Sequence, residues 1–245
     1  MRQACRISAI LPRRRARASA AAAQAREDVF GDVLADLAEG FQLARNLVDF
    51  LADGTDHERD VLGMKISVFG LGYVGAVTAG CLASRGHTIV GVDVQQEKVD
   101  AINAGHAPII EPGLPELMED GVRHGRIKAT LDCDEAIRET EASIVCVGTP
   151  SAESGALDLG FIRQVSAQIA AAVQTKTSPH RLLFRSTMLP GSTASIVEEK
   201  LGELEGGELL DVFYYPEFLR ESTAVKDFEE PSLAVVGSRD GSSPS

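Results

Sequence analysis

A glycine-rich turn constrains this chain more than any other feature of its sequence. The residues GLGYVG follow the short apolar run KISVF and open an apolar, alanine-rich stretch. This order of strand, Gly-X-Gly-X-X-Gly and helix is the fingerprint of a dinucleotide-binding βα unit. The pattern therefore predicts a strand over 65–69, a tight turn, and a helix that continues to about Arg85.

Each glycine of the turn has its own steric reason. Gly70 allows the tight turn, Gly72 lets the backbone approach a pyrophosphate, and Gly75 lets the helix pack closely on the strand. The free N–H groups at the helix start, near Tyr73 and Val74, are expected to hold the phosphates with the help of the helix dipole. The alternative is a tight strand–helix turn without a dinucleotide.

An acidic residue ends the next predicted strand. Asp93 closes the run IVGVD, eighteen residues beyond Gly75. A carboxylate at this place accepts hydrogen bonds from the adenosine ribose hydroxyls and repels a 2′-phosphate. Because Val94 and Gln95 follow instead of a basic residue, the sequence predicts NAD over NADP. An exposed Asp in an ordinary βα turn is the alternative.

Strand and helix patterns alternate from Met64 onward. The strands are continuous apolar runs, which is typical of a parallel sheet covered on both faces. We predict the α/β class, with a doubly wound parallel sheet of Rossmann type as a single domain over 64–237. After the helix that ends near Arg85, the expected helices are 97–103, 111–122, 134–138, 159–173 and 189–204, and the strands are 65–69, 88–93, 126–130, 142–147, 181–185, 210–214 and 232–236.

The first 63 residues differ in composition from the rest. Residues 1–25 hold six Arg and no acid, and acids dominate from there to residue 63. Apolar residues at helical spacing favour an amphipathic helix over 27–52. We expect a disordered or partly helical extension over 1–63, rather than a secretory signal, and a truncated Gly/Ser/Pro-rich tail over 238–245.

Composition excludes several classes of protein. The net charge of −12 argues against a nucleic-acid binder, which needs clustered Lys and Arg. No apolar run approaches the roughly 20 residues of a membrane span. The four cysteines, Cys5, Cys81, Cys133 and Cys146, form no CxxC pair and have no His at metal-ligand spacing. We expect neither a metal site nor a disulfide framework, and a reducing compartment.

Three further segments supply candidate ligand contacts. Thr149 and Thr187 each follow a predicted strand, where ligands of open α/β sheets lie. Each Thr also suits a turn cap, so that reading stays open. The segment YPEFLREST carries two carboxylates, Glu217 and Glu221, and an arginine. Taken alone, such a loop is usually a solvated surface.

The stretch from Met64 to about Val236 resembles the NAD-binding domain of nucleotide-sugar 6-dehydrogenases, the UDP-glucose/GDP-mannose dehydrogenase family. The forms GLGYVGAV, LDLG and RES are closer to the GDP-mannose branch than to the UDP-glucose branch, where GTGYVGL and PEFLAEG are usual. The segments that carry the resemblance are FGLGYVGAVTAGCLASRGH, VGVDV, PIIEPGL, CVGTPS, LDLGFI, FRSTMLPGS and PEFLRES.

The resemblance implies a cytoplasmic enzyme that oxidises the sugar C6 alcohol to a carboxylate. Family members use two NAD⁺ and pass through a thiohemiacetal and a thioester on a cysteine, and full-length members form homo-oligomers. The GDP-mannose branch makes GDP-mannuronate for alginate-type exopolysaccharide. The matching positions imply Glu221 in the sugar-nucleotide site, Glu217 as an aid to thioester hydrolysis, and NAD contacts at Tyr73, Val74, Asp93, Lys98, Thr149 and Thr187.

Two departures from the family pattern matter. Tyr215 stands before PEF where the family usually has Asn, and no Gly-Gly-Ser-Cys-like nucleophile segment occurs. We therefore expect a fragment without turnover, because no thiohemiacetal forms without that thiolate. The alternatives are a UDP-glucose 6-dehydrogenase fragment, a non-catalytic NAD-sensing module, and a β-hydroxyacid dehydrogenase, which needs a catalytic Lys on a following helix.

Overall fold

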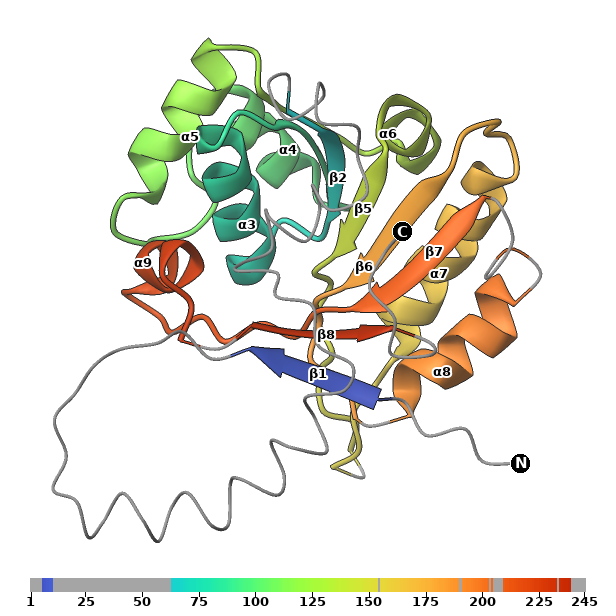
Figure 1. The fold of residues 1–245 in the computed structure, drawn as a ribbon. Helices are drawn as coiled ribbons and strands as arrows, with labels where there is room; N and C mark the ends of the chain where they lie inside the picture. The colour runs from blue at the N-terminus through green and yellow to red at the C-terminus, as the bar shows by residue number, and fades with distance from the viewer. Residues whose placement is uncertain are drawn as a thin grey trace, which may run out of the picture.

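One twisted sheet of eight strands organises the chain, with helices on both of its faces (Figure 1). The computed structural model describes residues 6–10, 63–153, 155–189, 191–202, 204, 209–232 and 234–238. The strand order is β1-β8-β7-β6-β5-β2-β3-β4. The strands are β1 (Arg6–Ile10), β2 (Lys65–Phe69), β3 (Thr88–Val92), β4 (Ile127–Thr130), β5 (Ala142–Val145), β6 (His180–Phe184), β7 (Leu210–Tyr214) and β8 (Ala234–Ser238).

Six strands, β2 to β7, are parallel, and the chain moves outward from the middle in two directions. β2, β3 and β4 fill one half of the sheet, and β5, β6 and β7 fill the other. The order reverses between β2 and β5, where Phe69 pairs in register with Val145. Open α/β sheets bind their ligands beyond the carboxyl ends of the strands at such a reversal point. The doubly wound Rossmann-type fold predicted from the sequence is confirmed.

Two hydrophobic clusters, one on each face, hold the helices to the sheet. The first joins the sheet to α3 (Tyr73–Ser84), α4 (Gln96–Asn103), α5 (Leu114–Arg123) and α9 (Ala224–Glu229). The second joins it to α6 (Cys133–Glu139), α7 (Gly160–Val173), α8 (Ser192–Ile196) and the π-helical turn η3 (Val197–Leu201). Side chains that alternate along β2 enter different clusters, since Val68 belongs to the first and Phe69 to the second. Burial on both faces explains why the strands are apolar without alternation.

The outer edge of the sheet differs from the all-parallel arrangement that the sequence predicted. β8 pairs antiparallel with β7 through Tyr214 and Gly237. β1 pairs antiparallel with β8, so that Arg6 lies opposite Ser238. The predicted parallel pairing is therefore wrong for β8, and β1 lies in a segment for which no strand was predicted. The chain returns to the sheet after β7 without a full crossover helix, since only the short α9 intervenes, and an antiparallel edge strand results.

Other differences concern single elements. Arg6–Ile10 forms a strand within the segment expected to be disordered or helical, and the helix expected over 27–52 lies outside the described residues. The helix predicted over 189–204 divides into α8 and η3. The short helix α9 was not predicted. The domain boundary at residue 64 stays a prediction.

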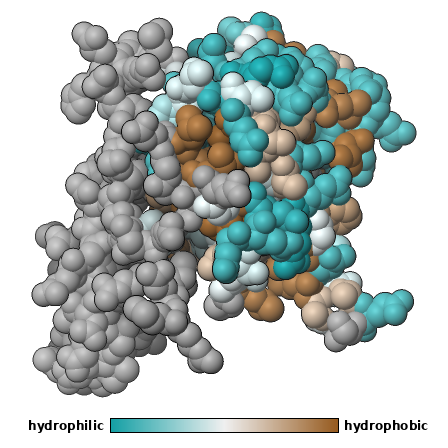
Figure 2. All heavy atoms as spheres, turned by 90° about the vertical axis from the view of Figure 1, so that its right-hand side faces the viewer, coloured by the Kyte–Doolittle hydropathy of each residue, from teal (hydrophilic) through white to brown (hydrophobic). Residues whose placement is uncertain are grey.

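The side of the molecule that carries α6, α7 and α8 is mainly hydrophilic (Figure 2). Hydrophobic residues in this view form small separate groups rather than one continuous patch. Phe161 and Leu131 are among the exposed apolar side chains of the described chain, at 55% and 50% exposure. None of the helices described is both long and apolar enough to cross a bilayer.

Candidate functional site

The glycine-rich turn lies at the reversal point of the sheet and is held by backbone contacts. Gly70 has a φ of 88°, a left-handed conformation that favours glycine. Its N–H donates to the carbonyl of Val92 at 2.8 Å. A Cβ on Gly70 would lie 2.9 Å from the backbone nitrogen of Val147, which follows β5. The turn therefore fits between the ends of β3 and β5 only without a side chain.

Gly75 and Gly72 meet opposite environments. A Cβ on Gly75 would lie 1.8 Å from the carbonyl oxygen of Gly70, so the packing of α3 on the turn requires glycine there. A Cβ on Gly72 would meet no atom within 4 Å. The fold itself leaves room for a side chain at position 72. A group that approaches the turn from outside would collide with such a side chain, so glycine keeps this space open. This open space fits the pyrophosphate of a dinucleotide.

The first turn of α3 presents unpaired backbone donors to the same space. Ala76 donates to the carbonyl of Gly72 at 2.9 Å, which starts the helical hydrogen bonding. Within the described part of the chain, the N–H groups of Tyr73 and Val74 have no acceptor, and no acidic side chain caps this end. Together with the positive end of the helix dipole, these N–H groups form a place for an anionic phosphate.

Asp93 stands beside the turn and supports it. The residue is buried, at 8% exposure. One carboxylate oxygen accepts from the N–H of Leu71 at 2.8 Å and lies 3.4 Å from the ammonium of Lys98. The other accepts from the N–H of Gln95 at 3.0 Å. Each carboxylate oxygen has two acceptor sites, so the second oxygen keeps capacity for a ribose hydroxyl.

The two threonines predicted at the strand ends come together. The hydroxyl of Thr149 donates to the carbonyl oxygen of Thr187 at 3.0 Å. Ser186 donates to the carbonyl oxygen of Val147 at 2.6 Å and so ties the same two loops. Thr149 is half-buried and Thr187 is exposed. Both threonines therefore line the carboxyl edge of the sheet beside the glycine-rich turn.

A buried carboxylate that the sequence reasoning missed connects the turn to the 220–224 loop. Glu111 is only 2% exposed and accepts the phenolic hydrogen of Tyr73. Its carboxylate also accepts from the N–H of Ser222 at 2.8 Å and from the N–H of Ala224, also at 2.8 Å. Ala224 is the first residue of α9, so Glu111 caps that helix from outside the local sequence.

These contacts change the acidity of both side chains. Burial and then the hydrogen bond to Glu111 raise the pKa of Tyr73 to about 12. Burial alone would raise the pKa of Glu111 as well, but the hydrogen bonds from Tyr73, Ser222 and Ala224 outweigh it and lower that pKa. At neutral pH the pair is a neutral phenol that donates to a carboxylate. The connection between turn and loop is therefore charge-assisted.

The loop itself carries the two predicted carboxylates in different settings. Glu217 is half-buried and accepts from the N–H of Leu219 at 2.7 Å. Glu221 is exposed and precedes Ser222, whose φ of 70° is unusual for a residue with a side chain. Contacts to Asp227 and Glu111 brace the loop at either end, so Glu221 is held out toward solvent.

No described cysteine has the character of a nucleophile. Burial is the largest cause that raises the pKa of Cys81 and of Cys146 to about 12, and that of Cys133 to about 11. A thiolate, rather than a thiol, attacks a carbonyl. No group of three or more His, Cys, Asp or Glu side chains able to hold a metal occurs among the residues that the structure describes.

Tyr215, which departs from the family pattern, has a structural place. The residue is buried at 5% exposure, directly after β7. Its ring lies against the guanidinium of Arg185, 5.1 Å from centroid to Cζ. Tyr215 therefore fills space beside the buried guanidinium of Arg185, at the ends of β6 and β7.

Comparisons with known proteins agree with this geometry. A family model described as the UDP-glucose/GDP-mannose dehydrogenase family, NAD binding domain, matches residues 64–244. The GDP-mannose 6-dehydrogenase of Azotobacter vinelandii is 49% identical over 183 residues, which cover 74% of this chain and 42% of the relative.

Solved structures show the same relationship. A ternary complex of GDP-mannose dehydrogenase from Pseudomonas aeruginosa matches with a TM-score of 0.66 and 47% identity, over 69% of this chain and 39% of that one. A UDP-glucose dehydrogenase from Pyrobaculum islandicum matches with a TM-score of 0.65 and 37% identity, over the same shares. The chain spans about two-fifths of the length of the curated relatives that it matches.

Fold and site together define a dinucleotide-binding domain of the dehydrogenase class. The chain belongs to the UDP-glucose/GDP-mannose dehydrogenase family and holds the NAD-binding domain of that family. The family, the NAD cofactor and the Rossmann-type fold predicted from the sequence are confirmed.

Proposed function

We propose that the protein to which this domain belongs oxidises the C6 hydroxyl of GDP-mannose to the carboxylate of GDP-mannuronate. The overall change consumes one alcohol, two NAD⁺ and one water, and it yields a carboxylate, two NADH and three protons. The bound NAD⁺ supplies the hydride acceptor in this chemistry. The residues described here bind and orient that acceptor and one side of the substrate.

The observation that carries the proposal is the open space at Gly72, next to the unpaired N–H groups of Tyr73 and Val74. We assign the diphosphate of NAD to the N–H groups of Tyr73 and Val74, and the adenosine ribose to Asp93. Lys98, whose ammonium lies 3.4 Å from Asp93 Oδ2, helps to position that carboxylate beside the assigned ribose. A ribose 2′-phosphate would meet a carboxylate there, so NADP is disfavoured.

The nicotinamide half is assigned to the edge formed by Thr149 and Thr187. Their mutual hydrogen bond keeps the β5 and β6 loops together next to the turn. We assign the sugar nucleotide to the neighbouring 220–224 loop, with Glu221 at its exposed side and Glu217 as the residue that orients water. Glu111 and Tyr73 position this loop against the cofactor turn.

Sequence similarity supports the substrate. Identity is 49% to a GDP-mannose 6-dehydrogenase and 37% to the UDP-glucose dehydrogenase of Pyrobaculum islandicum. The nucleotide base and the catalytic thiolate have no assigned residues among these 245. We therefore propose that this chain alone binds NAD⁺ without turnover, and that catalysis belongs to the longer, oligomeric enzymes of the family.

Calorimetric titration of the purified chain with NAD⁺ and NADP⁺ tests the proposal. We expect saturable NAD⁺ binding at one site and weaker binding of NADP⁺. A second assay follows absorbance at 340 nm with GDP-mannose and NAD⁺, where no NADH should form. Tighter binding of NADP⁺ would overturn the role of Asp93, and steady NADH production would overturn the assignment of the chemistry to other residues.

A further inference from the structure

The turn at residues 220–223, in the loop to which we assign the sugar nucleotide, contains a strained serine. The N–H of Thr223 donates to the carbonyl of Arg220 at 3.1 Å, which places Glu221 and Ser222 at the centre of the turn. Among the described residues other than glycine, only Ser222 has a positive φ, of 70°. The third residue of a type II turn has such a φ, and it is usually Gly or Asn. A serine in this conformation persists only where its surroundings hold it.

The peptide group between Glu221 and Ser222, which we name the 221–222 peptide, has two possible orientations. A type I turn over the same four residues needs a φ of about −90° at its third residue. The two turn types differ in ψ of the second residue and φ of the third, which together rotate the peptide group between these residues by about half a turn. In a trans peptide, as this one is, C=O and N–H point in opposite directions, so the rotation exchanges their places.

Glu111 and Tyr73 select one of these two orientations. The N–H of Ser222 donates to Glu111 Oε2 at 2.8 Å and also to the hydroxyl oxygen of Tyr73 at 3.2 Å. In the other orientation, the carbonyl oxygen of Glu221 would take the place of this N–H. The buried carboxylate of Glu111 would then lose a donor and face an acceptor, which is costly. The pair therefore stabilises the strained conformer and keeps the carbonyl of Glu221 directed away from Glu111.

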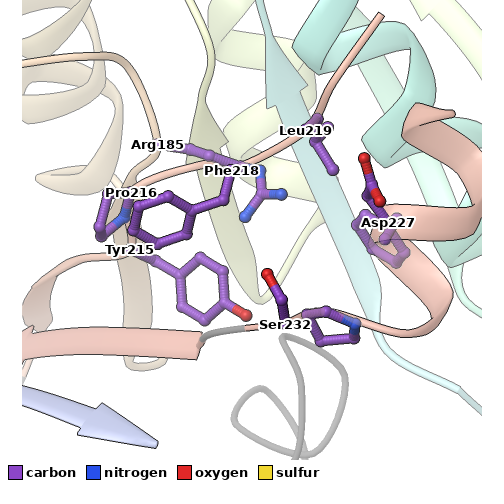
Figure 3. A pocket seen from close by; sticks show the side chains of 9 residues that line it. Arg185, Tyr215, Pro216, Phe218, Leu219, Asp227 and Ser232 are labelled. Atoms are coloured by element: carbon purple, nitrogen blue, oxygen red, sulfur yellow. The ribbon is translucent and has the colours of Figure 1, made fainter. Parts of the chain in front are cut away.

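The ends of the turn are held separately, by Asp227 of α9. Its carboxylate accepts from the backbone N–H of Arg220 at 3.1 Å and from the hydroxyl of Thr223 at 3.0 Å. Asp227 and Leu219, which precedes the turn, both line the small cavity drawn in Figure 3. These contacts involve neither Glu111 nor Tyr73. A rotation of the 221–222 peptide is therefore a local change that leaves the ends of the turn in place.

Tyr73 connects the 221–222 peptide to the cofactor turn. It is the first residue of α3, and its backbone N–H is one of the two donors that we assign to the diphosphate of NAD. Its hydroxyl donates to Glu111. A diphosphate on the N–H restrains the backbone that carries the phenol, so the hydroxyl leaves Glu111 less often. A ligand that restricts motion at one site in this way favours the ordered state of a second site.

We propose that the 221–222 peptide is a two-state element, and that Tyr73 and Glu111 are positioning residues that couple it to NAD. Cofactor binding favours the conformer with a positive φ at Ser222, so Glu221 keeps one orientation in the substrate loop. The coupling is reciprocal, because a ligand that needs this conformer binds more tightly when NAD is present, by the same factor. The inference rests on the proposed function, from which it takes the cofactor and substrate sites.

Hydrogen exchange of the Ser222 amide measures the coupling. Saturating NAD⁺ should slow this exchange by at least about fivefold in the unmodified 245-residue chain. The amide of Lys65, which donates to Glu141 at the opposite edge of the sheet, is the reference for general stabilisation by a ligand. In Tyr73→Phe, which loses the hydroxyl but keeps the ring and the N–H, NAD⁺ should slow Ser222 no more than Lys65.

Substitution of Ser222 tests the two-state element without cofactor. Glycine adopts a positive φ without strain, so in Ser222→Gly the amide of residue 222 should be protected at least about fivefold more than in the unmodified chain. Ser222→Ala is the matched control, because alanine has the same restriction on φ as serine, and it should gain no protection.

Two results would overturn the inference even if Tyr73→Phe does not fold. One is bound NAD⁺ that slows Ser222 no more than Lys65 in the unmodified chain. The other is Ser222→Gly protected no better than Ser222→Ala. A chain that binds no NAD⁺ would instead overturn the proposed function, and the coupling with it, whereas the two Ser222 variants would still report on the 221–222 peptide.

Discussion

The carboxylate of Glu111 accepts a 2.8 Å hydrogen bond from the backbone N–H of Ser222, 111 residues further along the chain. The same carboxylate accepts the hydroxyl of Tyr73, in the first turn of the cofactor-site helix. One buried side chain therefore joins the two segments to which we assign cofactor and substrate. Its low exposure and its several hydrogen-bond donors make Glu111 sensitive to substitution.

Substitution of Glu111 by Gln should weaken the hydrogen bond from the N–H of Ser222 more than the one from the N–H of Ala224. Glu111 Oε2 serves Tyr73 and Ser222, whereas Oε1 serves Ala224. If the amide oxygen stays with Ala224, the new NH₂ group faces the N–H of Ser222. Losing one charge-assisted hydrogen bond costs about 1.5–3 kcal/mol, which corresponds to at least tenfold faster amide exchange.

Hydrogen exchange of single backbone amides measures this effect. Glu116→Gln, at an exposed acid of α5, is the matched control and should leave both amides unchanged. Equal exchange of Ser222 in Glu111→Gln and the unmodified chain would show that the loop does not depend on Glu111.

Gly72→Ala and Gly75→Ala should affect different properties of the domain, the first cofactor binding and the second stability. At Gly75 the added Cβ overlaps the Gly70 carbonyl oxygen at 1.8 Å, so we expect a loss of stability of about 1–3 kcal/mol or more. At Gly72 the added Cβ meets nothing within 4 Å, so stability should change by less than about 0.5 kcal/mol. Urea unfolding measures both values.

The Gly72 variant should nevertheless lose cofactor. Its methyl group occupies the space that we assign to the diphosphate, so NAD⁺ affinity should fall by at least about tenfold, or 1.4 kcal/mol. Unchanged NAD⁺ affinity in a folded Gly72→Ala protein would remove the main support for the assigned site.

Replacement of Asp93 by Asn should weaken NAD⁺ binding by about 1.5–3 kcal/mol, the scale of a hydrogen bond to a charged group. The ratio of NADP⁺ to NAD⁺ affinity should rise, because the charge that repels a 2′-phosphate is gone. Calorimetric titration measures both, with Asp100→Asn, an exposed acid on α4, as control. An unchanged ratio would argue that Asp93 does not face the ribose.

Acid should destabilise the domain through a buried imidazole. Burial, and then the neighbouring charge of Lys176, lower the pKa of His180 to about 3. The ring lies between Ser143 Oγ at 2.7 Å and Lys176 Nζ at 3.0 Å. His180 stays neutral in the folded chain but takes a proton near pH 6.5 in the unfolded chain. Stability is therefore lost as the pH falls from about 6.5 toward 3, by up to about 1.4 kcal/mol per pH unit.

Urea unfolding between pH 6.5 and 5 isolates this effect from most carboxylates. His87, whose pKa is lowered by burial and then by Arg85, acts in the same direction. His180→Gln should therefore lose part of the pH dependence, about 2 kcal/mol over this range, and keep the remainder. A full pH dependence in His180→Gln would show that His180 titrates normally in the folded chain.

The central strands could be predicted from the sequence because each is a short apolar run that must be buried on both faces. β2 and β7 have the predicted bounds, and β3 differs by one residue. The role of Gly75 also followed from the motif, because its steric demand is local to the turn. Local chemistry of this kind is visible in a linear sequence.

Long-range contacts could not be predicted in the same way. α9 is a six-residue segment, AVKDFE, with three charged residues, and its start depends on a cap from Glu111. Glu111 preceded a Pro-Gly pair and suggested only a helix start. Its partners are 38 and 111 residues distant, so no spacing rule connects them. The antiparallel edge strands likewise depend on pairing between distant segments.

The contact between Asp93 and the N–H of Leu71 limits how cofactor preference can be redesigned. The side chain to which we assign the ribose also accepts from the backbone of the loop to which we assign the diphosphate. Exchanging that acid for a small or basic residue is the usual first step toward NADP. It would also remove the acceptor of the Leu71 N–H and so destabilise the glycine-rich loop. A successful swap needs a second change that gives the Leu71 amide a new acceptor.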